Sequence, residues 1–174
     1  MRLTPMEKRS LGPVIDEGSR LLILGTMPGD ESLGQCQYYA NPRNQFWTIL
    51  ARVYEELVGL TYSDRVTFLM GKRLALWDVL QSAERRGSTD RTIKNPVAND
   101  FKRIFGQFLG LRAIAFNGGN AESLFRRLVD QGAATRAYSH LQRFVLPSSS
   151  PSPGQYTLTL EEKIVKWRIL LDWQ

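Results

Sequence analysis

The stretch Arg20-Leu-Leu-Ile-Leu-Gly-Thr-Met-Pro-Gly29 decides the fold. Its first half is a short apolar run that stops at Gly25, a pattern typical of a buried strand. Its second half turns the chain, because Pro28 fixes its own φ and Gly29 tolerates positive φ. The stretch therefore predicts a core strand whose carboxyl end carries a tight turn.

Working outward from this strand, two further apolar runs predict buried strands, at 112–116 and 142–146. A third run, 75–80, is short enough to be either a strand or a helix. Apolar residues recur at helical spacing in four other segments. These are residues 45–57 (with Leu57 on the apolar face), 100–109 (with Asn99 as the N-cap), 121–130 and 160–173. Residues 84–94 are polar and predict a loop.

Strands that alternate with helices predict a fold class. We expect an α/β protein with a three-layer α/β/α sandwich, a central, mostly parallel four-stranded sheet, and one domain over residues 1–174. In such folds a ligand binds beyond the carboxyl ends of the strands. The segments that follow the strands are 25–29, 117–119 and 147–151, and all three are small, polar or rich in glycine and proline.

Composition narrows the class of protein. The chain has 174 residues, enough for one domain with a buried core, and no apolar run approaches the 18 residues of a membrane span. The first ten residues lack the apolar core of a signal peptide, so a cytoplasmic address is expected. The net charge of +6 favours a polyanionic partner such as nucleic acid. We expect a monomer.

The cysteine and histidine counts exclude several kinds of site. One cysteine, Cys36, and one histidine, His140, leave no ligands for a disulfide framework, a zinc site or an iron–sulfur cluster. We therefore expect no metal and no cofactor, and we expect His140 to lie at the surface.

An ordered set of motifs resembles the uracil-DNA glycosylase superfamily. Gly25-Thr-Met-Pro-Gly29 is similar to its first motif, and Pro147-Ser148 is similar to its second, a Pro-Ser loop before the last helix. Tyr39-Ala-Asn-Pro-Arg-Asn-Gln-Phe-Trp47 resembles a segment shared by the mismatch-specific and deoxyinosine branches. Three further segments resemble the deoxyinosine branch: 76–79, 99–101 and 116–118. The resemblance runs in order over residues 20 to 172.

The resemblance implies a monofunctional enzyme that flips a deaminated base out of DNA and hydrolyses its N-glycosidic bond. It places Gly25, Thr26 and Met27 at the base, where backbone N–H groups stabilise the departing anion. Relatives often carry Asp or Asn at the position of Met27 to hold the attacking water, which a thioether cannot do. The deoxyinosine branch uses instead the Asn that corresponds to Asn44. The alternative for Asn44 is a cap for the helix that follows it.

Three more side chains are candidates for contact with the base. The resemblance gives Phe46 the role of stacking on the flipped base, although its helical spacing equally fits core packing, where we expect Trp47. Asp78 is suited to accept the N1–H of hypoxanthine, and its alternatives are a helix cap or an ion pair. Asn117 either contacts the base or satisfies loop backbone.

The Pro-Ser loop and scattered arginines are candidates for DNA phosphates. The resemblance implies that Ser148, Ser149 and Ser150 bind phosphate, whereas a plain surface loop is the alternative. Leu146 stands where relatives place His or Asn, which argues against a strict uracil enzyme. Five arginines are expected at the surface, with phosphate contact as the alternative: Arg43, Arg85, Arg86, Arg91 and Arg143.

Hypoxanthine, from deoxyinosine in single- or double-stranded DNA, is therefore the first choice of base. The alternatives are a mismatch-specific uracil or thymine glycosylase and a DNA-damage-binding module without catalysis. Base release from defined duplexes separates the three hypotheses.

Overall fold

The computed structural model describes residues 7–131, 138–151 and 158–174. Its main sheet has the order β3-β2-β6-β7 and every neighbouring pair is parallel. The strands are β2 (Leu21–Gly25), β3 (Leu74–Asp78), β6 (Ala113–Asn117) and β7 (Gln142–Leu146). The predicted four-stranded parallel sheet is thus confirmed, and the ambiguous run at 75–80 begins as a strand.

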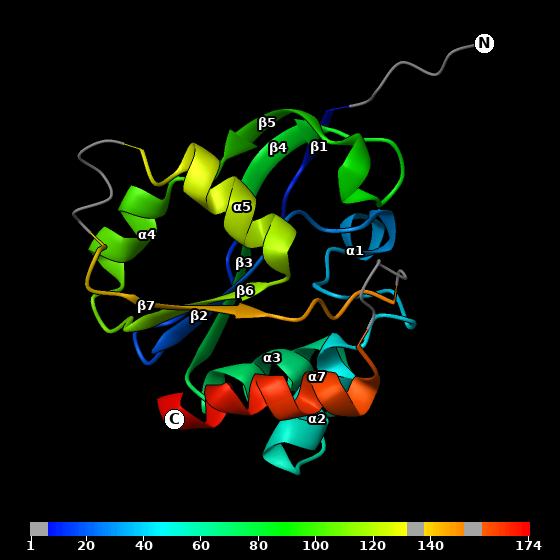
Figure 1. The fold of residues 1–174 in the computed structure, drawn as a ribbon. Coiled ribbons are helices and arrows are strands. Elements are labelled where there is room, and N and C mark those ends of the chain that lie inside the picture. The colour runs from blue at the N-terminus through cyan, green and yellow to red at the C-terminus, as the bar shows by residue number, and fades with distance from the viewer. Residues whose placement is uncertain (1–6, 132–137, 152–157) are drawn as a thin grey trace.

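Helices cover both faces of this sheet, which confirms the three layers (Figure 1). One layer consists of α2 (Phe46–Tyr54), α3 (Tyr62–Gly71) and α7 (Leu160–Trp167), with a 3-10 continuation over Arg168–Trp173. The other contains α4 (Phe101–Gln107) and α5 (Gly119–Leu128). A short α1 (Asp30–Gln35) follows the first motif beside the carboxyl edge of the sheet (Figure 1).

A second sheet was not predicted. It is antiparallel, has the order β1-β4-β5, and consists of β1 (Glu7–Arg9), β4 (Leu80–Glu84) and β5 (Lys94–Ala98). The prediction of a loop over 84–94 is therefore wrong at its two ends, while a 3-10 turn, Asp90–Thr92, lies between them. The strands escaped notice because β5 is largely exposed and polar and contains Pro96, as an edge strand can.

Several predicted helix boundaries need correction. The cap of α4 is Asp100, whose Oδ1 accepts from the Arg103 N–H at 3.0 Å. Asn99 instead donates from Nδ2 to the carbonyl of Asp78 at 2.8 Å. Helix α2 ends at Tyr54 because Glu55 adopts a left-handed conformation with φ 54°, so Leu57 lies outside the helix and is 95% exposed.

The core lies on both sides of the main sheet. Strands β2 and β3 are buried at every position, as expected for a parallel sheet covered on both faces. Trp167 of α7 is fully buried and packs edge-on to Phe46 of α2 with ring centroids 5.7 Å apart. No helix in the described part of the chain is long and apolar enough to cross a membrane.

Two leucines test which part of the α2 segment supports the core. Leu50 is fully buried, whereas Leu57 is 95% exposed. We expect Leu50→Ala to lower the free energy of unfolding by about 2–5 kcal/mol, through lost burial and a residual cavity. The matched change Leu57→Ala is expected to alter it by less than about 0.5 kcal/mol. Urea denaturation measures both, and equal losses would contradict this boundary.

Candidate active site

The first motif lies at the carboxyl end of β2, directly beside the end of β3. The parallel register sets Gly25 opposite Asp78. A Cβ at position 25 would lie 2.5 Å from Asp78 Oδ1 and 3.2 Å from the Tyr39 hydroxyl oxygen. Only glycine therefore lets the carboxylate and the phenol approach the main chain of the motif.

The turn after Gly25 aims its N–H groups away from the second sheet. The carbonyls of Gly25 and Thr26 accept from the N–H groups of Val79 and Leu80, at 2.9 and 3.1 Å. In a trans peptide the next residue's N–H points opposite to the carbonyl, so the N–H groups of Thr26 and Met27 point the other way. Within the described residues neither of these N–H groups has a hydrogen-bond acceptor.

The side chain of Met27 does not contribute to this site as a polar group. It belongs to the hydrophobic core and is 7% exposed. The predicted participation of Met27 is thus reduced to its main chain. Thr26 is also buried.

Asp78 is the carboxylate at the centre of the site. It is buried, and its Oδ2 accepts from the Ser10 hydroxyl at 3.0 Å. Within the described residues no donor bonds to Oδ1, the oxygen that faces Gly25. Burial raises the pKa of Asp78 to about 7, while the hydrogen bond from Ser10 opposes that shift. The carboxyl group can therefore change its charge near neutral pH, and among the residues that the structure describes it neither caps a helix nor forms an ion pair.

Asn117, at the end of β6, makes three hydrogen bonds through its amide within the protein. Its Nδ2 donates to the Tyr39 hydroxyl at 2.9 Å and to Ser149 Oγ at 2.8 Å, while its Oδ1 accepts from the Ser149 N–H at 2.8 Å. Asn117 thus joins three loops at the carboxyl edge. The alternative that it satisfies loop groups agrees with this geometry.

The structure favours the core alternative for Phe46 and packs a partly buried Tyr39 against that core. Phe46 is fully buried, and its ring stacks on that of Tyr39 with centroids 3.9 Å apart and planes within 9°. Tyr39 is only half-buried and is therefore the outer ring of the pair. Trp47 is in the core, as predicted.

Asn44 lies in the loop before α2 and acts in part as a cap. Its Oδ1 accepts from the Phe46 N–H at 3.0 Å. An amide oxygen has two lone pairs, so a second acceptor position remains. The next residue, Gln45, donates its N–H to the carbonyl of Ser149 at 3.0 Å, which ties this loop to the Pro-Ser loop.

The three serines after β7 differ in exposure. Ser149 is fully buried and bound to Asn117, so its hydroxyl, which was predicted to bind phosphate, is engaged within the protein. Ser148 is exposed and Ser150 half-buried, and the Ser150 N–H donates to Ser148 Oγ at 3.2 Å. The predicted loop continues from residue 152, and residues 152–157 lie outside the part of the chain that the structure describes.

Arg85 is the residue whose position differs most from expectation. Its side chain is fully buried rather than at the surface, and its guanidinium lies 3.9 Å from Asp90 Oδ1. It donates to the carbonyls of Met27 and Pro28, at the back of the first motif. Burial lowers the pKa of Arg85, and burial raises that of Asp90, while each partner favours the other's charge.

Sequence reasoning missed Tyr39, Ser10 and the burial of Arg85. Tyr39 stood inside a quoted motif, and its aromatic character beside Asn44 was a usable signal. No local pattern indicated Ser10, because it is the pairing between strands that brings it to Asp78, 68 residues away in the sequence. Arg85 lies in a run of charged residues, a pattern that predicts a segment exposed to solvent.

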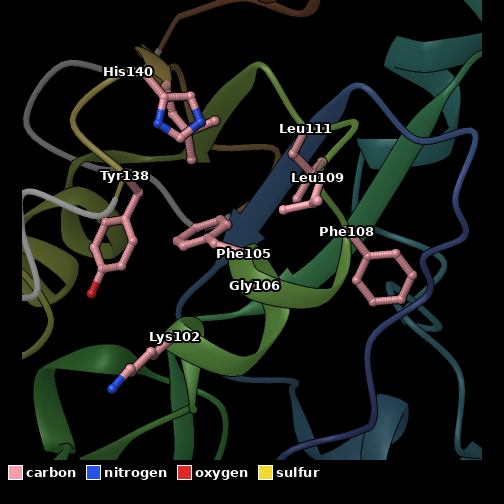
Figure 2. Close-up of a pocket in the computed structure, with 9 residues that line it drawn as sticks. Lys102, Phe105, Gly106, Phe108, Leu109, Leu111, Tyr138 and His140 are labelled. Carbon is pink, nitrogen blue, oxygen red and sulfur yellow. The ribbon is translucent and has the colours of Figure 1, made fainter.

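The opposite edge of the sheet carries a different feature. A hollow of about 360 Å³ lies beside the amino ends of β6 and β7 and is mostly apolar (Figure 2). His140 borders it and is exposed, as predicted. Among the described residues no group of three or more His, Cys, Asp or Glu side chains could hold a metal ion.

Comparison with known proteins was made against this geometry. A sequence model described as the uracil DNA glycosylase superfamily matches residues 13–173. A Methanosarcina acetivorans protein named hypoxanthine DNA glycosylase is 35% identical over 159 residues, which are 91% of this chain and 96% of the relative. A Methanosarcina barkeri protein of the same name is 36% identical over 127 residues, 71% of this chain and 80% of the relative.

A solved structure is also similar. The solution NMR structure of a Methanosarcina acetivorans protein has a TM-score of 0.74 and 34% sequence identity. The similarity covers 95% of this chain and 99% of that one.

The raised pKa of Asp78 gives a pH-dependent stability with a definite sign. The folded pKa, about 7, is above the ordinary value of 3.8, so the folded state binds this proton more tightly than the unfolded state does. The stability advantage of Asp78→Asn over wild type should therefore grow as pH rises from about 4 to 7, by up to roughly 4 kcal/mol at 1.36 kcal/mol per pKa unit. Denaturant titrations of both proteins measure it, and a constant difference would show an unshifted carboxyl group.

Proposed function

Because the chain belongs to the uracil-DNA glycosylase superfamily, we propose that it hydrolyses the N-glycosidic bond of hypoxanthine in DNA, leaving an abasic site. The observation that carries the proposal is the meeting of the first motif, the Asn44 loop and the Pro-Ser loop at one edge of the sheet. Asn117 and Gln45 hold these loops together. Relatives at 35% and 36% identity bear the name hypoxanthine DNA glycosylase.

Base recognition is assigned to Asp78 and Tyr39. Hypoxanthine carries an N1–H, and the ionised carboxylate of Asp78 can accept it through Oδ1, the oxygen beside Gly25. Tyr39 offers the outer aromatic face for stacking, since Phe46 behind it is fully buried. The buried Leu146 presents no polar group to a base at the end of β7.

Bond cleavage is assigned to charge stabilisation and to a positioned water. As the glycosidic bond breaks, negative charge develops on the base and positive charge on the sugar. The N–H groups of Thr26 and Met27 are suited to stabilise the base anion, at about 3 kcal/mol for each well-placed donor. The second lone pair of Asn44 Oδ1 would orient water toward the sugar cation. An amide cannot take the proton, so the cation supplies the activation.

DNA binding is assigned to the exposed part of the Pro-Ser loop and to the net positive charge. Ser148 is the exposed hydroxyl nearest to Gly118, where a Cβ would lie 3.1 Å from Ser148 Cβ and where φ is 100°. Ser149 instead sets the position of Asn117. A cytoplasmic, monomeric protein acting on either single- or double-stranded DNA remains our prediction.

The function of Asn44 can be separated from its role as a cap. We expect Asn44→Ala to lower the single-turnover rate of hypoxanthine release by about 10² or more, the scale expected when a reacting group loses its orientation. Asn44→Ser retains an acceptor for the Phe46 N–H but reaches less far, and we expect a similar loss. The assay uses labelled duplexes with deoxyinosine, uracil, xanthine, or thymine opposite guanine.

The same panel tests the alternatives. Wild-type activity in Asn44→Ser would reduce Asn44 to a cap. Release of uracil or thymine without hypoxanthine would favour the mismatch-specific alternative, and tight binding without any release would favour the damage-binding module. Asn41→Ala serves as the control, because Asn41 Oδ1 makes a similar bond to the Arg43 N–H at 2.8 Å in the same loop.

Gly25→Ala tests the close approach of Asp78 to the first motif. A Cβ at 2.5 Å from Asp78 Oδ1 must displace the carboxylate, so we expect hypoxanthine release to fall at least about 10-fold while the fold persists. Gly106→Ala is the control, since nothing lies within 4 Å of its Cβ position. Circular dichroism and thermal unfolding monitor both folds. Full activity in Gly25→Ala would remove Asp78 from the recognition of the base.

A further inference from the structure

Arg85 makes its contacts at the back of the first motif, on the side away from the pocket. One guanidinium nitrogen donates to the carbonyl of Met27 at 3.2 Å, and the other donates to the carbonyl of Pro28. These two carbonyls continue the series begun by Gly25 and Thr26, whose carbonyls are bound by the N–H groups at the start of β4 and just before it. Hydrogen bonds thus hold four consecutive carbonyls of the turn.

The hydrogen bonds to these carbonyls fix the directions in which the N–H groups of the turn point. Because each peptide is trans, the N–H that follows a held carbonyl points to the opposite side. Arg85 in this way orients the N–H of Gly29, and the main chain at β3 and β4 orients those of Thr26 and Met27. In the described part of the chain none of these three N–H groups has an acceptor. Unsatisfied N–H groups within one turn of the main chain can bind an anionic or carbonyl ligand.

Arg85 also brings a cation that is only partly neutralised. Its side chain is fully buried, and its Nε has no hydrogen-bond partner among the described residues. Among the described residues the carboxylate that pairs with it, that of Asp90, lies at 3.9 Å, beyond hydrogen-bonding distance. Burying a charge in this way destabilises the fold, and a methionine would fill the same space with a smaller loss of stability.

We propose that Arg85 is a positioning residue for base departure: it clamps the carbonyls of Met27 and Pro28, so it fixes the turn of the first motif and aims the N–H of Gly29 at the anionic leaving base. The inference rests on the proposed function. It also accounts for a motif that works with Met27, since the stabilisation comes from the main chain and from the cation behind it rather than from a side chain at that position.

The test compares Arg85→Met and Arg85→Lys with Arg112→Met. Arg112 is a matched control, because its guanidinium also binds two main-chain carbonyls, those of Leu109 and Leu111 at 2.8 and 3.1 Å, but at the amino end of β6. Both Met variants lose one positive charge. We expect Arg85→Met to lower the saturating single-turnover rate on deoxyinosine duplex at least 10-fold, with half-saturation changed less than threefold. Arg85→Lys should recover part of the rate, and Arg112→Met should match wild type within twofold.

A leaving-group comparison excludes a merely structural effect. The 8-aza analogue of hypoxanthine keeps the same N1–H edge but is a more acidic base, so it leaves with less assistance. If Arg85 acts through the departing anion, Arg85→Met should slow the deoxyinosine duplex several-fold more than the duplex with the 8-aza nucleotide. Equal losses on the two substrates, or no loss, would overturn the proposal. Arg85→Lys gives the same comparison if the Met variant does not fold.

A readout without turnover separates this proposal from the proposed function. Free hypoxanthine added to ¹⁵N-labelled protein should shift the amide signals of Thr26, Met27 and Gly29 in wild type and in Arg112→Met, and the Gly29 shift should be much smaller in Arg85→Met. A Gly29 shift that persists in Arg85→Met would overturn the positioning role even if wild type cleaves DNA. Wild type that releases no base from any duplex would instead refute the proposed function.

Discussion

The parallel pairing of β2 with β3 is the constraint on which the site depends. Its register ends with Gly25 opposite Asp78, and the missing side chain at Gly25 is the space that Asp78 Oδ1 and the Tyr39 hydroxyl approach. A slip of one residue would turn every side chain of β2 to the other face and would put Leu24 against the carboxylate. The same edge then receives Asn117 from β6 and the Pro-Ser loop from β7, because parallel strands end together. The site is therefore a consequence of the sheet's register rather than of any one motif.

Buried charge in so small a protein is concentrated at this edge. Asp78 and Arg85 lie beside the first motif, and Lys163 of α7 is buried where it donates from Nζ to Gln45 Oε1 at 2.8 Å. Burial raises the pKa of Asp78 and lowers that of Lys163, so each group is kept at a cost to folding. The opposite edge, with its apolar hollow and exposed His140, has no comparable cluster among the described residues. Buried ionisable groups that gather at one edge of a sheet are typical of a functional site.

The sequence predicted the main sheet and the loops of the site because both depend on local patterns. The apolar runs that became β2, β6 and β7 and the Gly/Pro turns after them are readable residue by residue. The second sheet was not predicted, because β5 is a polar edge strand and its pairing with β4 is a tertiary event. Phe46 and Tyr39 show the same limit: spacing identifies two aromatics near Asn44, but only the packing decides which ring is inside. Ser10 hydrogen-bonds to Asp78, which is 68 residues away in the sequence, and no periodic pattern predicts a contact at that separation.

The identity of residue 27 determines how the catalytic work is divided. With a carboxylate at that position the enzyme could activate water directly, but the Met27 side chain lies in the core and only its main chain reaches the site. In the proposed mechanism Asn44 orients water through its remaining lone pair, yet an amide cannot remove a proton, so the water attacks only after the sugar has become cationic. The barrier must then be lowered mainly by stabilising the departing base. That requirement gives weight to the direction of the main-chain N–H groups, which hydrogen bonds on the far side of the turn control. This control of the N–H groups gives a physical reason for burying the Arg85 guanidinium, although the buried charge destabilises the fold.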